Sequence, residues 1–267
     1  MVRSESIVGL VTTVFKDYIE FVSIASGSKR DFKTRLYAEF ARIGKAVASP
    51  HRLEMLEVLA QGERTVESLA TETGLSVANA SRHLQQLRQA QLVLSRREGL
   101  FVHYRLAGPE VVSLMLALRH AGERHLAEVD RVVRDFFGER DGFEPVTQSE
   151  LAQRLTSSEV VVLDVRPAQE YAAGHIAGAR SMPVADIEAR LGELPRDQQY
   201  VAYCRGPYCV FADEAVAVLR ANGRSARRLS EGYPEWWLAG RPVHAGTSTV
   251  HQDAHGPDRH RVAGGST

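Results

Sequence analysis

The chain has 267 residues, with 33 basic and 33 acidic side chains, so its formal net charge is zero. This length supplies enough chain for about two domains with buried cores. The balanced charge excludes a polypeptide that is basic or acidic throughout, so a nucleic-acid site would have to arise from local charge. The two cysteines lie in one short stretch, which excludes a disulfide scaffold and favours a reducing, cytoplasmic location. No apolar run reaches the roughly 20 residues of a spanning helix, so we expect no membrane partner.

Residues 1–32 form an N-terminal extension with weak helical spacing, and either a dimer-packing helix or a flexible segment fits it. From Lys33 the apolar residues recur at helical spacing up to Ser49-Pro50, which predicts a helix that ends there. A second helix follows from Pro50 to Gly62, since proline suits the first turn. A third helix is predicted between Thr65 and Gly74.

The fourth predicted helix, from Ser76 to Gln89, has an apolar face and a polar, basic face. A run from Leu92 to Leu106 then reads as two strands around a Glu98-Gly99 turn. Three helices, a polar-faced fourth helix and a basic hairpin predict a winged helix-turn-helix. The polar face could also be simply solvated. The candidate DNA-binding residues are Ser76, Val77, Asn79, Arg82, Gln85, Arg96 and Arg97.

The stretch from Gly74 to Val93 resembles the ArsR/SmtB repressor family, whose pattern is Leu-Ser-x-x-x-Val-Ser-x-His-Leu-x-x-Leu-x-x-Ala-Gly-Leu-Val. Two positions depart from it: Ala80 replaces the usual valine, and Gln91 replaces the usual glycine. The resemblance implies a mainly α winged-helix domain over residues 33–138 that binds double-stranded operator DNA. We predict one long apolar helix from Pro109 to Phe137, and in that family this helix pairs across a two-fold axis, which implies a homodimer.

Many relatives in that family sense metals through cysteines of the third helix, but this stretch contains none. A thiolate metal site there is therefore excluded. The long helix carries His120, Glu123, His125 and Glu128, and their role as zinc ligands stays open beside a solvated helix face. We assign no metal ligand and no cofactor.

A charged, glycine-containing linker over residues 138–144 leads to a second domain over residues 143–244, and we expect residues 245–267 to be a disordered tail. In this domain Gln199 to Tyr203 reads as a buried strand, and Phe211 to Asn222 has helical spacing. The loop Cys204-Arg205-Gly206-Pro207-Tyr208-Cys209 lies between them. Main-chain amides that open a helix favour an anion, so a thiolate at Cys204 is expected to have a lowered pKa. The alternative is a buried structural thiol.

This loop resembles the active-site loop of single-domain rhodaneses, which are sulfurtransferases. Two further motifs agree, in order along the chain: Asp164-Val165-Arg166 with Glu170 to Ala179, and Gly232 to Trp236. The resemblance implies an α/β domain with a mostly parallel sheet, in which Cys204 carries a sulfane sulfur as a persulfide. Arg205 and Cys209 complete the catalytic set, Gly206, Pro207 and Tyr208 form the loop, and Asp164 and Arg166 support it.

Two details of the loop narrow its chemistry. Position 210 is valine, where phosphatases with a related cradle need arginine, so phosphate chemistry is disfavoured. Cys209 could attack a Cys204 persulfide and release sulfide, or it could be a small packed residue. The sequence therefore predicts a DNA-binding regulator whose second domain senses or transfers sulfane sulfur from a donor to a thiol acceptor. Whether that domain is a sensor or an enzyme stays open. The alternative is a metal-responsive repressor with a non-catalytic rhodanese module.

Overall fold

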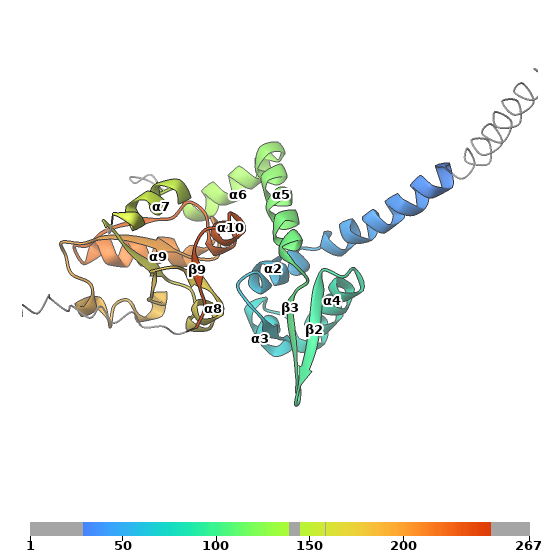
Figure 1. Ribbon diagram of the computed structural model, residues 1–267, viewed down its shortest axis with the longest axis horizontal. Helices are drawn as coiled ribbons and strands as arrows, with labels where there is room; N and C mark the ends of the chain where they lie inside the picture. Colours follow the sequence, from blue (N-terminus) through green and yellow to red (C-terminus); the bar gives the residue numbers. More distant parts are fainter. Residues whose placement is uncertain (1–28, 139–144, 158, 247–267) are drawn as a thin grey trace, which may run out of the picture. The chain divides into compact units, whose positions relative to one another are not determined.

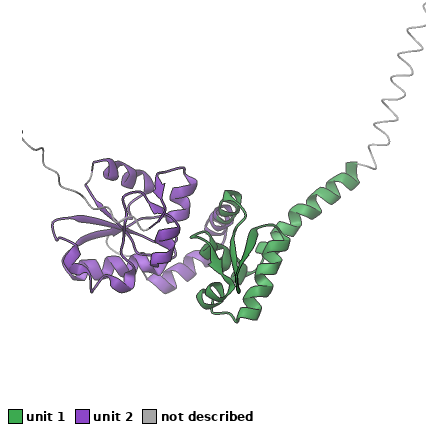
Figure 2. Cartoon of the chain, turned by 60° about the horizontal axis from the view of Figure 1, so that its bottom comes forward, with its two compact units in different colours: residues 1–115 green, residues 116–267 purple. Residues whose placement is uncertain are grey.

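A computed structural model describes residues 29–138, 145–157 and 159–246 of the chain. The chain divides into two compact units, residues 1–115 and 116–267 (Figure 2). Our expectations for residues 1–28, 139–144 and 247–267 lie outside the described residues. The domain limits proposed at residues 33, 138, 143 and 244 stay predictions.

The first unit has the order of helices and strands that the sequence predicts for a winged helix-turn-helix (Figure 1). Residues 29–47 are helical, and an antiparallel sheet has the strand order β1-β3-β2. The remaining elements are α2 (Pro50–Leu59), β1 (Arg64–Thr65), α3 (Val66–Glu72), α4 (Val77–Gln89), β2 (Val93–Glu98) and β3 (Phe101–Leu106).

Local signals set the ends of these helices. The Thr65 hydroxyl accepts a hydrogen bond from the Ser68 amide at 3.2 Å, and the Ser76 hydroxyl accepts one from the Asn79 amide at 3.3 Å. Both are N-cap interactions of the kind that satisfy otherwise unpaired amides. Buried leucines of α3 and α4, together with Met55 of α2, form the core beneath the hairpin.

The turn from α4 into the hairpin contains a non-glycine residue in the left-handed region. Gln91 has φ of 59°. Its amide bonds to the Arg88 carbonyl at 2.9 Å, and the Leu92 amide bonds to the Leu87 carbonyl at 3.0 Å. This is the Schellman arrangement that usually ends in glycine. Gln91 therefore keeps the turn that the family's glycine makes, at a backbone cost that glycine would avoid.

The long helix predicted from Pro109 to Phe137 is interrupted, so that prediction is wrong on this point. The structure has α5 (Pro109–His125) and α6 (Ala127–Phe137), and Leu126 between them is extended, with φ −114° and ψ 99°. Gly122 lies one turn before the break, where its low helix propensity weakens the helix. Helix α5 begins in the first unit and ends in the second.

The rest of the second unit is an α/β fold around a four-stranded parallel sheet of order β6-β4-β7-β8, as the sequence predicts. A separate antiparallel pair joins β5 to β9. The strands are β4 (Val161–Asp164), β5 (His175–Ile176), β6 (Arg180–Ser181), β7 (Gln199–Tyr203), β8 (Ser225–Arg228) and β9 (Val243–His244). The helices are α7 (Gln148–Thr156), α8 (Ala168–Ala173), α9 (Val210–Ala221) and α10 (Tyr233–Leu238), with 3₁₀ turns at Val184–Asp186 and Leu191–Glu193.

Strand β7 is buried on both faces, and its alternation assigns each side chain to one of two cores. Tyr200 and Ala202 pack with residues of α9, and Cys204 just past the strand joins the same core. Val201 and Tyr203 pack on the other face with residues of α7 and α10. Because side chains alternate along a strand, Cys204 lies on the α9 side and Tyr203 on the opposite side.

Candidate functional site

The cysteine loop connects the end of β7 at Tyr203 to the start of α9 at Val210. Cys204 is 2% exposed, whereas Cys209, the N-cap residue of α9, is half-buried. The Cys204 thiol lies 3.4 Å from the Cys209 carbonyl oxygen and 3.6 Å from the Gly206 carbonyl oxygen, both acceptors for its proton. Main-chain amides of Gly206 and Ala212 also hydrogen-bond its sulfur. The two thiols are hydrogen-bonded to each other.

The acidity of the two thiols differs from the sequence expectation. Burial raises the pKa of Cys204 well above its usual range, and the hydrogen bond with Cys209 acts in the same direction. The pKa of Cys209 is lowered, first by the hydrogen bond from Cys204 and then by the amides of Arg205 and Phe211 and the charge of Arg205. The lowered pKa predicted for Cys204 is therefore wrong, because desolvation outweighs the amides. Of the two thiols, Cys209 is the one whose pKa is lowered.

Backbone and ionic contacts fix the loop. The Tyr233 amide donates to the Cys204 carbonyl at 3.2 Å. A Cβ on Gly232 would come within 2.3 Å of the Arg205 carbonyl oxygen, so only glycine allows this approach. The Arg205 guanidinium bonds to both carboxylate oxygens of Glu170, with Nε at 3.1 and 3.2 Å, and Glu170 is fully buried. Arg205 is thus an anchored cation beside Cys209.

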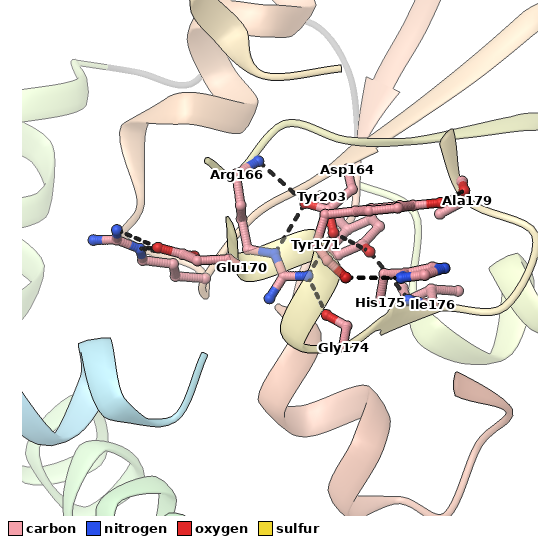
Figure 3. A network of polar contacts seen from close by, with 10 residues as sticks. Asp164, Arg166, Glu170, Tyr171, Gly174, His175, Ile176, Ala179 and Tyr203 are labelled. Atoms are coloured by element: carbon pink, nitrogen blue, oxygen red, sulfur yellow. Dashed lines mark hydrogen bonds and ion pairs between the residues drawn. The ribbon is translucent and has the colours of Figure 1, made fainter. Parts of the chain in front are cut away.

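A buried polar network centred on Asp164 and Arg166 includes Tyr203 (Figure 3). Arg166 donates to Asp164 from Nε at 2.9 Å and to the Gly174 carbonyl at 2.7 Å, and both charged side chains are fully buried. The Tyr203 hydroxyl donates to Asp164 and accepts from the Ile176 amide at 3.1 Å. The network ties the ends of β4 and β7 together immediately before Cys204.

Helix α5 also contributes to the surroundings of the loop within the second unit. The Tyr208 hydroxyl donates to Glu123 of α5 at 2.7 Å. Arg119 of α5 pairs with Glu235 of α10 at 2.7 Å, and Glu235 in turn accepts the Gly232 amide at 3.1 Å. Burial and then the Glu123 hydrogen bond raise the pKa of Tyr208 to about 12. The loop is therefore joined to α5 directly through Tyr208 and indirectly through α10.

In the first unit, helix α4 has one buried and one exposed face. Ala80, Leu84 and Leu87 are completely buried. The predicted DNA-binding residues Ser76, Val77, Asn79, Arg82 and Gln85 are all exposed. Asn79, Arg82 and Gln85 lie on the helix face opposite these buried side chains, whereas Ser76, the N-cap residue, and Val77 lie at the start of the helix.

The two hairpin arginines have different surroundings. Arg96 donates from Nε to both carboxylate oxygens of Glu63, at 2.9 and 3.0 Å, and also contacts Glu98. These carboxylates raise the pKa of Arg96 and offset its charge. Arg97 is exposed and donates to the Gly99 carbonyl at 3.2 Å. Of the two, Arg97 is the better placed to meet a phosphate.

Comparison with known proteins finds a matching family model for part of each unit. The model of the bacterial regulatory protein, arsR family, matches residues 49–95, and the rhodanese-like domain model matches residues 147–239. The HTH-type transcriptional regulator Rv0324 of Mycobacterium tuberculosis is 45% identical over 223 residues, which cover 84% of this chain and 98% of Rv0324. This chain is an arsR-family regulator with a rhodanese-like domain.

Each of two further proteins is similar to one part of the regulator. A sulfurtransferase of Allochromatium vinosum is 32% identical over 99 residues, 37% of this chain and 92% of the sulfurtransferase. A homodimeric winged helix-turn-helix DNA-binding domain from Mycobacterium bovis, solved by NMR, is 45% identical with a TM-score of 0.34. That match covers 35% of this chain and 87% of the NMR structure.

Sequence reasoning singled out the loop residues of the regulator but did not predict two of their partners. The structure pairs Arg166 with Asp164. Sequence reasoning did not foresee that Glu170 holds Arg205 or that Glu123 holds Tyr208. The buried Glu170 within the rhodanese motif was the available signal for the first pair. Nothing in the sequence signalled the second.

Among the described residues of the regulator, no group of three or more His, Cys, Asp or Glu is arranged to hold a metal ion. Within the same part of the chain, no helix combines the length and apolar character needed to cross a bilayer.

Proposed function

We propose that the regulator binds operator DNA as a homodimer and that sulfane sulfur, received by its cysteine loop, changes that binding. The DNA part is supported by the exposed polar face of α4. Asn79, Arg82 and Gln85 have the donors and acceptors that read base edges in the major groove. Arg97 on the hairpin has the charge to contact a phosphate.

The homodimer is supported by apolar side chains that remain exposed on two helices. On the helix over residues 29–47, Phe32, Tyr37 and Phe40 are 62%, 64% and 57% exposed. On α6, Val132 and Phe136 are 67% and 71% exposed. Exposed apolar surface of this extent favours a protein partner. A second copy of the chain is the partner we propose, in line with the homodimeric relative from M. bovis.

The sulfur chemistry is proposed in two steps. In the first, the Cys204 thiol passes its proton to the Cys209 thiolate through their hydrogen bond, and its sulfur attacks the outer sulfur of a persulfide donor R–S–SH. The S–S bond of the donor breaks, and R–S⁻ leaves. The products are a Cys204 persulfide, a Cys209 thiol and the donor thiolate. Cys209 thus acts as the base for its neighbour.

In the second step, Cys209 loses its proton and attacks the Cys204 Sγ. A Cys204–Cys209 disulfide forms, and HS⁻ leaves with the sulfur that was delivered. Overall, one donor persulfide and two thiols give one donor thiol, one disulfide and one H₂S. The lowered pKa of Cys209 suits it to this attacking role.

The observation that carries the regulatory proposal is the Tyr208–Glu123 hydrogen bond. Tyr208 precedes Cys209, so a change in the bonding of that cysteine acts on its position. Its partner Glu123 belongs to α5, whose first residue, Pro109, lies in the first unit. One continuous helix therefore connects the neighbourhood of the cysteine loop to the unit that carries α4.

Mass spectrometry with a cysteine persulfide donor tests the chemistry. The wild-type chain should form the disulfide and release one H₂S per chain. Cys209→Ser should gain one sulfur on Cys204, more slowly, and release no H₂S. Cys204→Ser should neither gain a persulfide at the loop nor form the disulfide. Persulfide formation at Cys209 in the Cys204→Ser chain would contradict the assigned order.

An enzyme would differ from a sensor in its number of turnovers, which can be measured with the same wild-type preparation. A sensor consumes about one donor per chain and stops, because the disulfide holds the oxidised state. An enzyme continues when a thiol acceptor is added and releases many equivalents of H₂S. Sustained turnover by the wild-type chain would favour the sulfurtransferase function.

A further inference from the structure

The rhodanese-like unit has a concave site at the amino-terminal ends of its sheet strands, opposite the cysteine loop. Strands β7 and β8 are parallel and begin in register at Gln199 and Ser225. A cleft of about 380 Å³ lies at these strand starts. Cys204 follows the other end of β7, about 17 Å away for five residues of extended strand. The cleft is therefore separate from the loop chemistry.

Arginine dominates the lining of this cleft. Its described lining residues include four arginines and no carboxylate: Arg154, Gln199, Arg220, Arg224, Ser225, Ala226 and Arg227. The arginines come from α7, from α9, from the turn after α9 and from β8. Four arginines from separate elements thus line one concavity.

Main-chain oxygens hold two of these arginines in place. Arg224 donates to three carbonyl oxygens, those of Leu191, Leu194 and Asn222, at distances between 2.6 and 3.1 Å. Arg220 donates from Nε to the Ala226 carbonyl at 2.7 Å. The three carbonyl oxygens fix the geometry of the Arg224 guanidinium without neutralising its charge. The cleft is therefore preorganised as well as charged.

The other two arginines share a carboxylate that lies outside the lining. Glu150 contacts Arg154 at 2.6 Å and Arg227 at 3.0 Å. Burial lowers the pKa of Arg220, and the positive charge of Arg227 lowers it further. The second effect indicates repulsion between the two arginines. Like charges held this close favour an anion between them.

We infer that this cleft binds a multivalent oxyanion, either a phosphate compound or a sulfur oxyanion. Guanidinium groups bind tetrahedral oxyanions with paired, charge-assisted hydrogen bonds. The lining also includes Ser225 and Gln199, whose side chains carry neutral donors. The described lining contains no aromatic ring on which a nucleobase could stack, so the charged group itself is what the cleft recognises.

Calorimetric titration of the full-length chain tests the inference. Pyrophosphate and thiosulfate serve as separate probes for the two sources of anion, with chloride at equal ionic strength as the reference. We expect saturable binding of at least one probe beyond the chloride reference. Its affinity should be unchanged in Cys204→Ser, which separates this site from the proposed sulfur chemistry.

Two substitutions that should change the affinity for the anion in opposite directions make the test specific. Arg227→Gln should weaken binding about tenfold, because it removes a charge-assisted hydrogen-bond donor. Glu150→Gln should tighten binding, because it removes the carboxylate that competes for Arg154 and Arg227. Arg190→Gln, which changes a half-exposed arginine paired with Glu193 elsewhere in the unit, is the matched control and should have no effect.

Three results would overturn the inference. Neither probe exceeding the chloride reference would show that the cleft does not bind oxyanions. Equal affinity in wild type, Arg227→Gln and Arg190→Gln would place any binding elsewhere. Weaker binding by Glu150→Gln would mean that Glu150 organises a site of another kind. If Arg227→Gln does not fold, Glu150→Gln decides the matter alone.

Discussion

The Asp164→Asn substitution tests whether the buried network supports the cysteine loop. Asp164 and Arg166 both have fully buried side chains, so neither water nor salt can replace the lost partner. Removing one member of such a pair costs about 3–5 kcal/mol, because the other charge stays buried. Arg166 keeps its bond to the Gly174 carbonyl and its stacking on Tyr233, so we expect the lower end, about 3 kcal/mol.

Urea unfolding followed by tryptophan fluorescence measures this loss in the right unit. The two tryptophans of the chain, Trp236 and Trp237, both lie in α10, so their signal reports the rhodanese-like unit. With a urea slope of about 2 kcal/mol/M, the midpoint should fall by about 1.5 M. Glu193→Gln is the control, since it breaks an exposed arginine pair and should leave the midpoint unchanged. A shift in Asp164→Asn no larger than in this control would refute the reasoning.

Three further predictions concern single positions. Gln91→Gly should stabilise the first unit by about 1 kcal/mol in thermal unfolding, because it relieves the left-handed backbone at φ 59°; a lower midpoint would contradict this. The neutral Tyr208 phenol stabilises the fold below its usual pKa of about 10, and this contribution is lost as pH rises through about 12. Glu123→Gln should therefore lower the pKa of Tyr208. The Tyr208 titration is isolated by subtracting the phenolate absorbance of the matching Tyr208→Phe chain from that of each chain. An unchanged pKa would contradict the hydrogen bond. Gly232→Ala should abolish persulfide formation at the loop, because its Cβ would strike the Arg205 carbonyl, whereas Gly192→Ala, where the Cβ meets open space, should react normally; equal reaction of the two variants would show that the loop adapts.

The sequence allowed prediction of features that depend on neighbouring residues. The helix starts at Thr65 and Ser76, the two faces of α4 and the strand–loop–helix around Cys204 all follow from local periodicity and turn chemistry. The parallel sheet was expected from the rhodanese resemblance and is present. Gln91 was recognised as a departure from the family glycine, and the structure shows that the turn is retained.

Features that depend on distant residues could not be predicted. Arg205 and Glu170 are 35 positions apart, Arg96 and Glu63 are 33 apart, and only the fold brings each pair together. Tertiary burial likewise reversed the expected pKa shift of Cys204, since a helix N-terminus suggests a thiolate but desolvation favours the thiol. The helix break at Leu126 could not be predicted from the sequence, because no proline lies there.

The most direct test of the central claim is the affinity of the full-length chain for a DNA duplex that it selects from a random pool. Fluorescence anisotropy at fixed salt would compare the reduced chain with the chain treated with a cysteine persulfide, since salt alone shifts such affinities. We predict a change of about tenfold or more in the wild type, a coupling of about 1.4 kcal/mol, that dithiothreitol reverses and Cys204→Ser lacks. The same response in wild type and Cys204→Ser, or no response in the wild type, would contradict control of DNA binding by the cysteine loop.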